Sequence, residues 1–221
     1  MSSIDDLLME IQTALGPAIG SSLTSASDAS DIFQAYAFTL LIEAAQTEGA
    51  AITYRDVSGN APTAFVFRTS PGYIFSKTRP YTHAVLAFPN KAPLEAHVGV
   101  RVVGKSGVLH ECDVAVITQL EAETCRVREV PPRSSKILIA VECKFYSTRL
   151  QLNLGRAFIG LTTDLSATQA VFASNSNSES LEKLLSGRGK LWEHNLVPAS
   201  SVEVMRLRHK FQEAFQHYKA K

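Results

Sequence analysis

The chain has 221 residues, a formal net charge of +1 and 45% hydrophobic residues, so it can bury a sizeable core and is unlike a disordered or collagen-like protein. Its acidic start and the lack of a run of roughly 20 apolar residues argue against a secretory signal and a membrane span. The odd count of three cysteines favours a reduced, cytoplasmic protein over a disulfide scaffold.

The charges are segregated along the chain. Residues 1–60 carry eight acidic residues and one basic residue, so the remaining residues have a net charge of +8. The near-neutral total therefore does not argue against a polyanionic partner.

The first half of the chain predicts helices followed by strands. Helical spacing of apolar residues predicts an N-terminal helix over 4–16 and a helix over 31–48 that is apolar on nearly every face. Period-two patterns and turn residues then predict strands at 52–57, 64–68, 84–88, 98–103 and 108–117. The last two strands form a hairpin around Gly104-Lys-Ser-Gly107.

A basic, proline-containing connector leads to the second half. There Lys136–Phe145 reads as a long strand, and its apolar run Ile137–Val141 has no alternation, as in a central strand buried on both faces. A helix over 150–162, a strand over 169–174 and helices over 179–186 and 202–219 follow. We expect a single α/β domain over residues 1–221, with a mixed central β-sheet flanked by helices.

Charged residues interrupt the two most apolar strands. Asp113 follows Leu109-His-Glu-Cys, and Glu142 and Lys144 share one face at the end of the Ile137–Val141 run. Buried charges are costly unless they pair or bind a metal. If the two strands are neighbours, the three charged groups converge on one small volume.

This group suits metal-assisted phosphodiester hydrolysis. Asp113, Glu142 and the backbone carbonyl of Cys143 offer the hard oxygen ligands that Mg²⁺ prefers, and the ion would activate a water for attack on phosphorus. Lys144 would orient that water or stabilise charge on the phosphate.

These residues resemble the PD-(D/E)XK nuclease superfamily, which has a restriction-endonuclease-like fold. The resemblance covers about residues 30–175 in the order helix, strand, strand with Asp113, strand with Glu142-x-Lys144, helix, strand. It implies a β region inserted at about 50–95, a C-terminal helical extension over 179–221, and a further metal ligand, Glu43, on the first core helix. Cys112 stands where the family motif has proline.

The resemblance implies a Mg²⁺-dependent nuclease, with Mn²⁺ as a substitute, that is an endonuclease acting on DNA, with RNA as the less favoured substrate that stays open. Restriction, phage defence and DNA processing are the roles that it leaves open. A homodimer or a partner subunit that supplies targeting is also left open, and no membrane is implied.

Basic side chains near the two key strands are candidates for phosphate contact, because such contacts dominate nucleic-acid affinity. They are Arg126, Arg128, Arg133, Arg149 and Arg156. The plainer alternative is that they form a solvated loop and helix face.

Two alternatives to a nuclease remain at this stage. One is a catalytically inactive module of the same fold that binds nucleic acid or serves in assembly, and the other is an unrelated α/β protein in which Glu142 and Lys144 form a core ion pair.

Two other motifs are set aside. A literal phosphate-loop match over 99–106 has strand patterns on both sides and no helix after it. Cys112, Cys125 and Cys143 lack the close spacing of zinc sites, and Cys112 and Cys143 are expected to pack on the face opposite the carboxylates.

Overall fold

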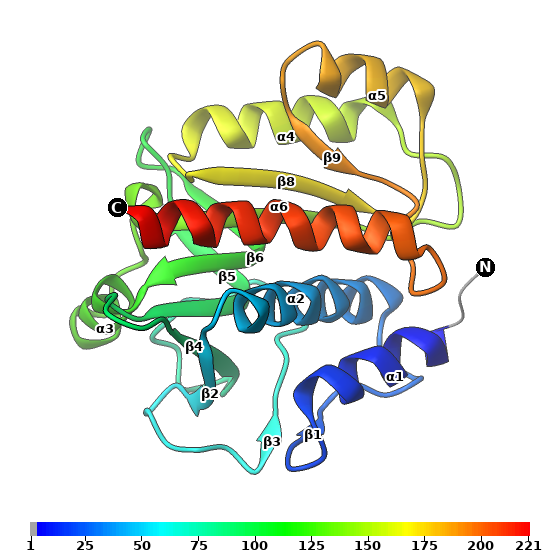
Figure 1. The fold of residues 1–221 in the computed structure, drawn as a ribbon. Coiled ribbons are helices and arrows are strands. Elements are labelled where there is room, and N and C mark those ends of the chain that lie inside the picture. Colours follow the sequence, from blue (N-terminus) through cyan, green and yellow to red (C-terminus); the bar gives the residue numbers. More distant parts are fainter. Residues whose placement is uncertain (1–3) are drawn as a thin grey trace.

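The computed structural model describes residues 4–221 and is a layered α/β arrangement (Figure 1). Its helices are α1 (Ile4–Leu15), α2 (Ala29–Thr47), α3 (Gln119–Arg128), α4 (Leu152–Asp164), α5 (Glu179–Ser186) and α6 (Ser201–Ala220), with a short 3₁₀ turn at Ser134–Lys136. Its strands are β1 (Gly20–Ser21), β2 (Ala51–Asp56), β3 (Ala64–Phe65), β4 (Thr82–Ala87), β5 (Leu94–Val103), β6 (Leu109–Thr118), β7 (Ile137–Lys144), β8 (Gln169–Ser174) and β9 (Leu191–Glu193).

Seven strands form one mixed sheet in the order β2-β4-β5-β6-β7-β8-β9. The pairs from β2 to β7 are antiparallel, whereas β7/β8 and β8/β9 are parallel. The strands β1 and β3 pair separately in a small parallel sheet. The predicted mixed sheet flanked by helices is therefore confirmed, and β6 and β7 are direct neighbours.

One face of the sheet is covered by α1, α2 and α6 (Figure 1). The helix α2 is buried on nearly every side because it lies between the sheet and its helical neighbours; Phe33, Phe38 and Leu41 are fully buried. Phe211 and Phe215 bring α6 into the same cluster as Val114 and Val141 of the sheet. The C-terminal helix is thus part of the main core.

The other face is covered by α3, α4 and α5. Ala122 and Cys125 of α3 pack with Ala115, Ile117 and Ala140 of the sheet, and a further cluster joins α4 and α5 to β8 and includes Phe158, Phe172 and Leu181. Because β7 has apolar side chains on both faces, it is buried as a central strand, as its unbroken apolar run predicts.

Three local expectations differ from the structure. The strand predicted at 64–68 is reduced to the two residues of β3, and the basic connector contains the helix α3, whose mixed polar sequence gives no clear apolar stripe. The short strand β9 follows α5 and adds to the sheet edge, where a three-residue strand leaves too little pattern to detect.

The β5–β6 hairpin forms as predicted. The Gly104 amide donates to the Val108 carbonyl at 2.9 Å, and Gly107 adopts a φ of 84°, which glycine tolerates. Asp164, at the end of α4, holds the turn through Ser106 and through His110 Nε2 at 2.6 Å. Strands flank the phosphate-loop match, so no helix N-terminus is available there to bind phosphate.

None of the helices in the part of the chain that the structure describes is long and apolar enough to cross a membrane.

Candidate functional site

The pairing of β6 with β7 brings the three predicted charged side chains together. The register places Val114 opposite Val141. Beyond this pair, β6 and β7 are joined by contacts of the Asp113 side chain with residues of β7. Lys144 Nζ lies 2.6 Å from Glu142 Oε1 and 3.8 Å from Asp113 Oδ2. The backbone amide of Cys143 donates to Asp113 Oδ2 at 2.7 Å. One ammonium group therefore serves two carboxylates from neighbouring strands.

Asp113 is the most buried member of this group, with 5% of its surface exposed. Burial raises the pKa of Asp113 to about 7, and repulsion from Glu142 acts in the same direction. Lys144 and the Cys143 amide oppose that rise. The protonated form of Asp113 thus competes with the carboxylate near neutral pH.

Lys144 is held in its charged form. Burial alone would lower its pKa, but the carboxylates of Glu142 and Asp113 outweigh burial, and the pKa is raised. The pKa of Glu111 is also raised, because the residue is partly buried and because the Glu142 carboxylate repels its negative charge. The group is therefore rich in acids relative to its single cation.

A cavity of about 380 Å³ opens beside Asp113 and Lys144. It is also lined by Glu111, by residues after the end of β7, and by the start of α2: Asp28, Ala29, Ser30, Gln34, Glu111, Cys143, Phe145 and Tyr146. Asp28 caps α2, because its carboxylate accepts the Ser30 amide hydrogen bond at 2.8 Å. The cavity thus contains an N-terminal helix end, which favours negatively charged groups.

The Cys143 carbonyl lies on the side of β7 that faces β6. In a strand, the amide and carbonyl of one residue point toward the same neighbour, and the Cys143 amide is directed at Asp113. That the carbonyl lies beside the two carboxylates remains a prediction.

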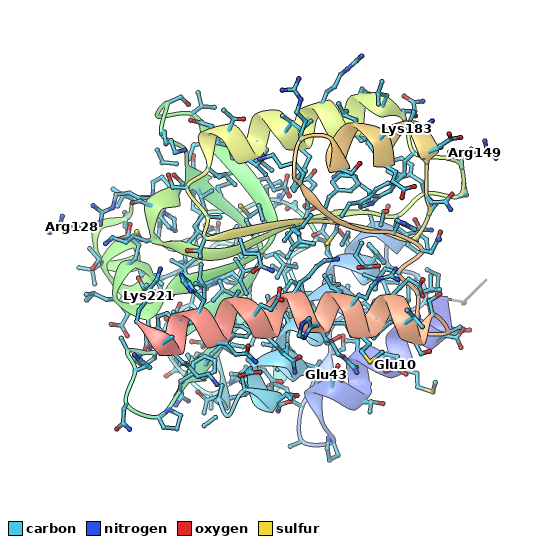
Figure 2. The ribbon with its side chains drawn as sticks, turned by 45° about the horizontal axis from the view of Figure 1, so that its top comes forward. Glu10, Glu43, Arg128, Arg149, Lys183 and Lys221 are labelled. Atoms are coloured by element: carbon cyan, nitrogen blue, oxygen red, sulfur yellow. The ribbon has the colours of Figure 1, made fainter. Side chains whose placement is uncertain are left out.

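The structure does not bring Glu43 to this group. Glu43 lies toward the C-terminal end of α2, where its carboxylate pairs with Arg208 of α6, and it does not line the cavity beside Asp113. Figure 2 shows Glu43 on the side of the molecule that α6 covers. Ser30 and Gln34, at the other end of the same helix, occupy the place that the sequence analysis gave to Glu43.

The five predicted phosphate-contacting arginines do not form one surface. Arg126 binds both oxygens of the buried Glu95, at 2.6 and 2.8 Å, and so serves as an internal partner. Arg133 is exposed and binds Glu121 at 2.7 Å. Arg128 and Arg149 are exposed on opposite sides of the molecule (Figure 2). Arg156 is exposed on α4.

A second buried polar cluster was missed by the sequence analysis. His83 of β4 and Glu95 and His97 of β5 lie together, with ligand atoms within 4.8 Å of one another. His97 Nε2 is 3.1 Å and His83 Nε2 is 3.5 Å from Glu95 Oε2. The sequence signal was present, because Glu95 and His97 are two residues apart on a strand and share a face, as Glu142 and Lys144 do.

This second cluster is neutralised internally. Burial would raise the pKa of Glu95, but hydrogen bonds from His97 and Arg126 lower it to about 2. Burial lowers the pKa of His83 to about 3 and also lowers that of His97, so both rings are neutral. The donor types suit a transition metal, but Arg126 already occupies both oxygens of Glu95.

All three cysteines are buried and unpaired. Their placement differs from the expectation that Cys112 and Cys143 share a face. Cys112 packs with Val100 and Ala115, whereas Cys143 packs with Val114 and Val141 on the other side of the sheet. The strand turns at Asp113, opposite Gly99, whose φ of 60° interrupts the regular alternation of β5.

Comparisons of the chain with protein-family models, with curated proteins and with solved structures find no match.

Proposed function

We propose that the protein is a Mg²⁺-dependent nuclease whose active site is the cavity beside Asp113, Glu142 and Lys144. The observation that carries this proposal is that two carboxylates from neighbouring buried strands share a single ammonium group, and that Asp113 and Lys144 of this group line a cavity. A divalent cation would relieve the repulsion that raises the pKa of Asp113.

The donor set fits such a cation. Magnesium takes oxygen ligands and retains several waters, so one or two carboxylates and a carbonyl are sufficient protein ligands. Asp113, Glu142 and the Cys143 carbonyl supply these atoms, and the nearest sulfur and imidazole groups point into other clusters. Bound there, Mg²⁺ would polarise the phosphate oxygens and offset the charge of the leaving oxygen.

The protein groups have distinct tasks in this proposal. The Cys143 amide fixes one oxygen of Asp113 and leaves the other free to bind. Glu142 holds Lys144 in place at 2.6 Å, and the raised pKa of Lys144 keeps it cationic. Lys144 would then orient the attacking water or stabilise the negative phosphate, as a compact point charge does well.

The order of elements also supports the proposal. The elements α2, β5, β6, β7, α4 and β8 occur in the order expected from the resemblance to the PD-(D/E)XK nucleases, with β2, β3 and β4 inserted after α2 and α3 inserted after β6, and Glu142-x-Lys144 ends the buried strand. By this resemblance the substrate is DNA in preference to RNA, and the reaction is endonucleolytic.

The test is cleavage of plasmid and linear DNA, and of RNA, by the purified full chain. We expect cutting with Mg²⁺ or Mn²⁺, no cutting with EDTA, and a loss of cutting in Asp113→Asn, Glu142→Gln and Lys144→Ala. The control is Lys183→Ala, which removes an exposed lysine of α5 (Figure 2) that pairs with Glu179 and does not line the cavity.

Cutting that survives in Asp113→Asn or Glu142→Gln would overturn the proposal. Salt-sensitive DNA binding without cleavage under any divalent ion would instead identify an inactive nucleic-acid-binding module.

A further inference from the structure

A buried arginine outside the proposed active site has no acidic partner. Arg68 lies between β3 and β4 with 8% of its surface exposed, and its Nε atom has no hydrogen-bond partner. Its Nη2 atom donates to the Tyr73 carbonyl at 2.7 Å. Among residues 4–221, no carboxylate pairs with it. An unpaired buried cation is costly, so its retention calls for a partner that the chain does not supply.

The surrounding backbone is shaped around this side chain. A Cβ at Gly72 would lie 1.5 Å from Arg68 Nη1, and a Cβ at Gly99 would lie 3.3 Å from Arg68 Cβ, so two glycines leave the space that the side chain fills. The guanidinium lies 3.6 Å from the centroid of the Tyr81 ring. Stacking on an aromatic face holds a guanidinium without neutralising it.

Arg68 lies in the wall of a cavity of about 520 Å³. Two further arginines, Arg79 and Arg101, line the same cavity, together with the hydroxyl-bearing side chains Thr69, Ser70, Tyr73, Ser76 and Thr78. Arg79 Nη1 donates to Ser70 Oγ at 3.0 Å, and the Arg101 guanidinium lies 5.4 Å from the centroid of the Tyr73 ring. Arg79 thus contacts an uncharged group, whereas Arg101 also lies opposite Glu111 of β6 and interacts electrostatically with its carboxylate.

Four arginines elsewhere in the described chain each bind a carboxylate: Arg126, Arg133, Arg206 and Arg208. Within the same residues, Arg68 and Arg79 have no such ion pair, and Arg101 faces Glu111 across the strands. The cavity lined by Arg68, Arg79 and Arg101, which we call the arginine pocket, therefore carries three cationic side chains and no acidic residue in its lining.

We propose that the arginine pocket binds a phosphomonoester, the terminal phosphate of a nucleotide or of an oligonucleotide. Guanidinium groups match phosphate oxygens in planar pairs of hydrogen bonds, and hydroxyl groups complete the set. Since Arg68 is almost fully buried, a terminal group can reach it, whereas the middle of a continuous phosphodiester chain cannot approach it closely.

The arginine pocket is a neighbour of the proposed active site. Arg101 of β5 lies directly opposite Glu111 of β6 in the register, and Glu111 lines the cavity that contains Asp113. The binding proposal does not rest on the nuclease proposal, because it requires neither a metal nor catalysis.

The test measures binding to the full chain by calorimetry and by thermal shift, in EDTA so that metal chemistry plays no part. The probes are inorganic phosphate, a nucleoside 5′-monophosphate with its nucleoside, and a single-stranded oligonucleotide with and without a terminal phosphate. We expect the phosphorylated member of each pair to bind at least about tenfold more tightly. A response to inorganic phosphate alone would identify an adventitious ion only and would overturn the proposal.

Substitutions of the three arginines test whether the phosphorylated probes bind in the arginine pocket. Arg68→Met fills a similar volume without charge, and Arg79→Ala/Arg101→Ala leaves the buried residue in place. Both should lose the preference for the phosphorylated probe, whereas the control Arg128→Ala, on an exposed helix end (Figure 2), should retain it.

Equal binding of phosphorylated and unphosphorylated probes by the unmodified chain, or an unchanged preference in both variants, would contradict the proposal. Because Asp113→Asn is expected to retain the preference, the failure of the nuclease proposal would leave this result standing.

Discussion

Glu95 of β5 and Asp113 of β6 are buried carboxylates on neighbouring strands, but their pKa values are shifted in opposite directions. Glu95 is fully buried, yet Arg126 binds both of its oxygens and the pKa of Glu95 is lowered to about 2. Asp113 is buried beside a second carboxylate, and its pKa is raised to about 7. Burial therefore does not by itself mark a functional acid; what distinguishes Asp113 is that its neighbours do not neutralise it.

The contrast separates a structural cluster from a functional one. Every strong charge near Glu95 is compensated by protein groups, so a ligand would have to displace Arg126. The cation close to Asp113 and Glu142 is Lys144, Glu111 also interacts with Arg101, and a cavity gives access to Asp113, Glu111 and Lys144. Perturbed carboxylates in accessible cavities are candidates for functional sites.

The largest expected effect is on catalysis. Lys144→Met removes the cation that would stabilise charge in the transition state, and we expect the rate of DNA cleavage to fall by about 10²–10³-fold or more. The measurement is the single-turnover cleavage rate with saturating Mg²⁺. Loss of less than about threefold would show that Lys144 acts only as a core ion pair.

The next largest effect is on stability, at the other cluster. Arg126→Met leaves Glu95 buried without its guanidinium partner, and we expect the free energy of unfolding to fall by about 3–5 kcal/mol. Denaturant unfolding measures this change. The control is Lys183→Met, which breaks an exposed pair with Glu179 and should cost less than about 0.5 kcal/mol. Equal effects of the two substitutions would contradict the view that the Glu95 cluster is a closed structural unit.

The pH dependence of stability should differ in sign between the two acids. In metal-free solution the Asp113 carboxyl of the unfolded chain ionises near the ordinary aspartate pKa of 3.8, whereas the folded chain retains the proton up to about pH 7. Stability is therefore lost as the pH rises through this window. Asp113→Asn removes that loss, so its stability relative to the unmodified chain should increase between pH 4 and pH 7 and then level off.

Glu95 provides the opposite case. Its folded pKa of about 2 lies below the ordinary glutamate pKa of 4.5, so its contribution to stability is present above pH 4.5 and is lost as the pH falls toward 2. Glu95→Gln should therefore destabilise the protein most at neutral pH. Parallel pH profiles for the two variants, from unfolding experiments at several pH values, would contradict the assignment of the two acids.

The smallest expected effect concerns Glu43. Its carboxylate is partly exposed and pairs with Arg208 away from the cavity, so Glu43→Gln should change the cleavage rate by less than about twofold and stability by about 1 kcal/mol or less. A loss of cleavage rate as large as that of Glu142→Gln would show that Glu43 takes part in the active site and would contradict this assignment.

The positions of Asp113, Glu142 and Lys144 could be predicted because strand rules are local. An unbroken apolar run identifies the central strand β7, the side chains of Glu142 and Lys144 alternate with Cys143, and a hairpin turn fixes the direction of β6. The adjacency of β6 and β7 agrees with the tendency of consecutive strands to pair, although α3 and a 3₁₀ turn lie between them in the chain.

The position of Glu43 could not be predicted in the same way. A helix that is apolar on every side gives no information about which end lies over the charged edge of the sheet, and the structure places Ser30 and Gln34 there. The partners of Arg126 and Arg68 depend on contacts between distant segments, which no spacing rule encodes. Gly99, whose positive φ accompanies the packing of Arg68, is not distinguishable in the sequence from other strand glycines.

The central claim is that the Asp113–Glu142 pair is a cation site. Crystals soaked in Mn²⁺ at pH 8, where Asp113 is ionised, test it most directly through anomalous density. We predict a peak between the carboxylates of Asp113 and Glu142 and the Cys143 carbonyl, which is absent in Asp113→Asn. No peak there, or a peak only at His83, Glu95 and His97, would contradict the account.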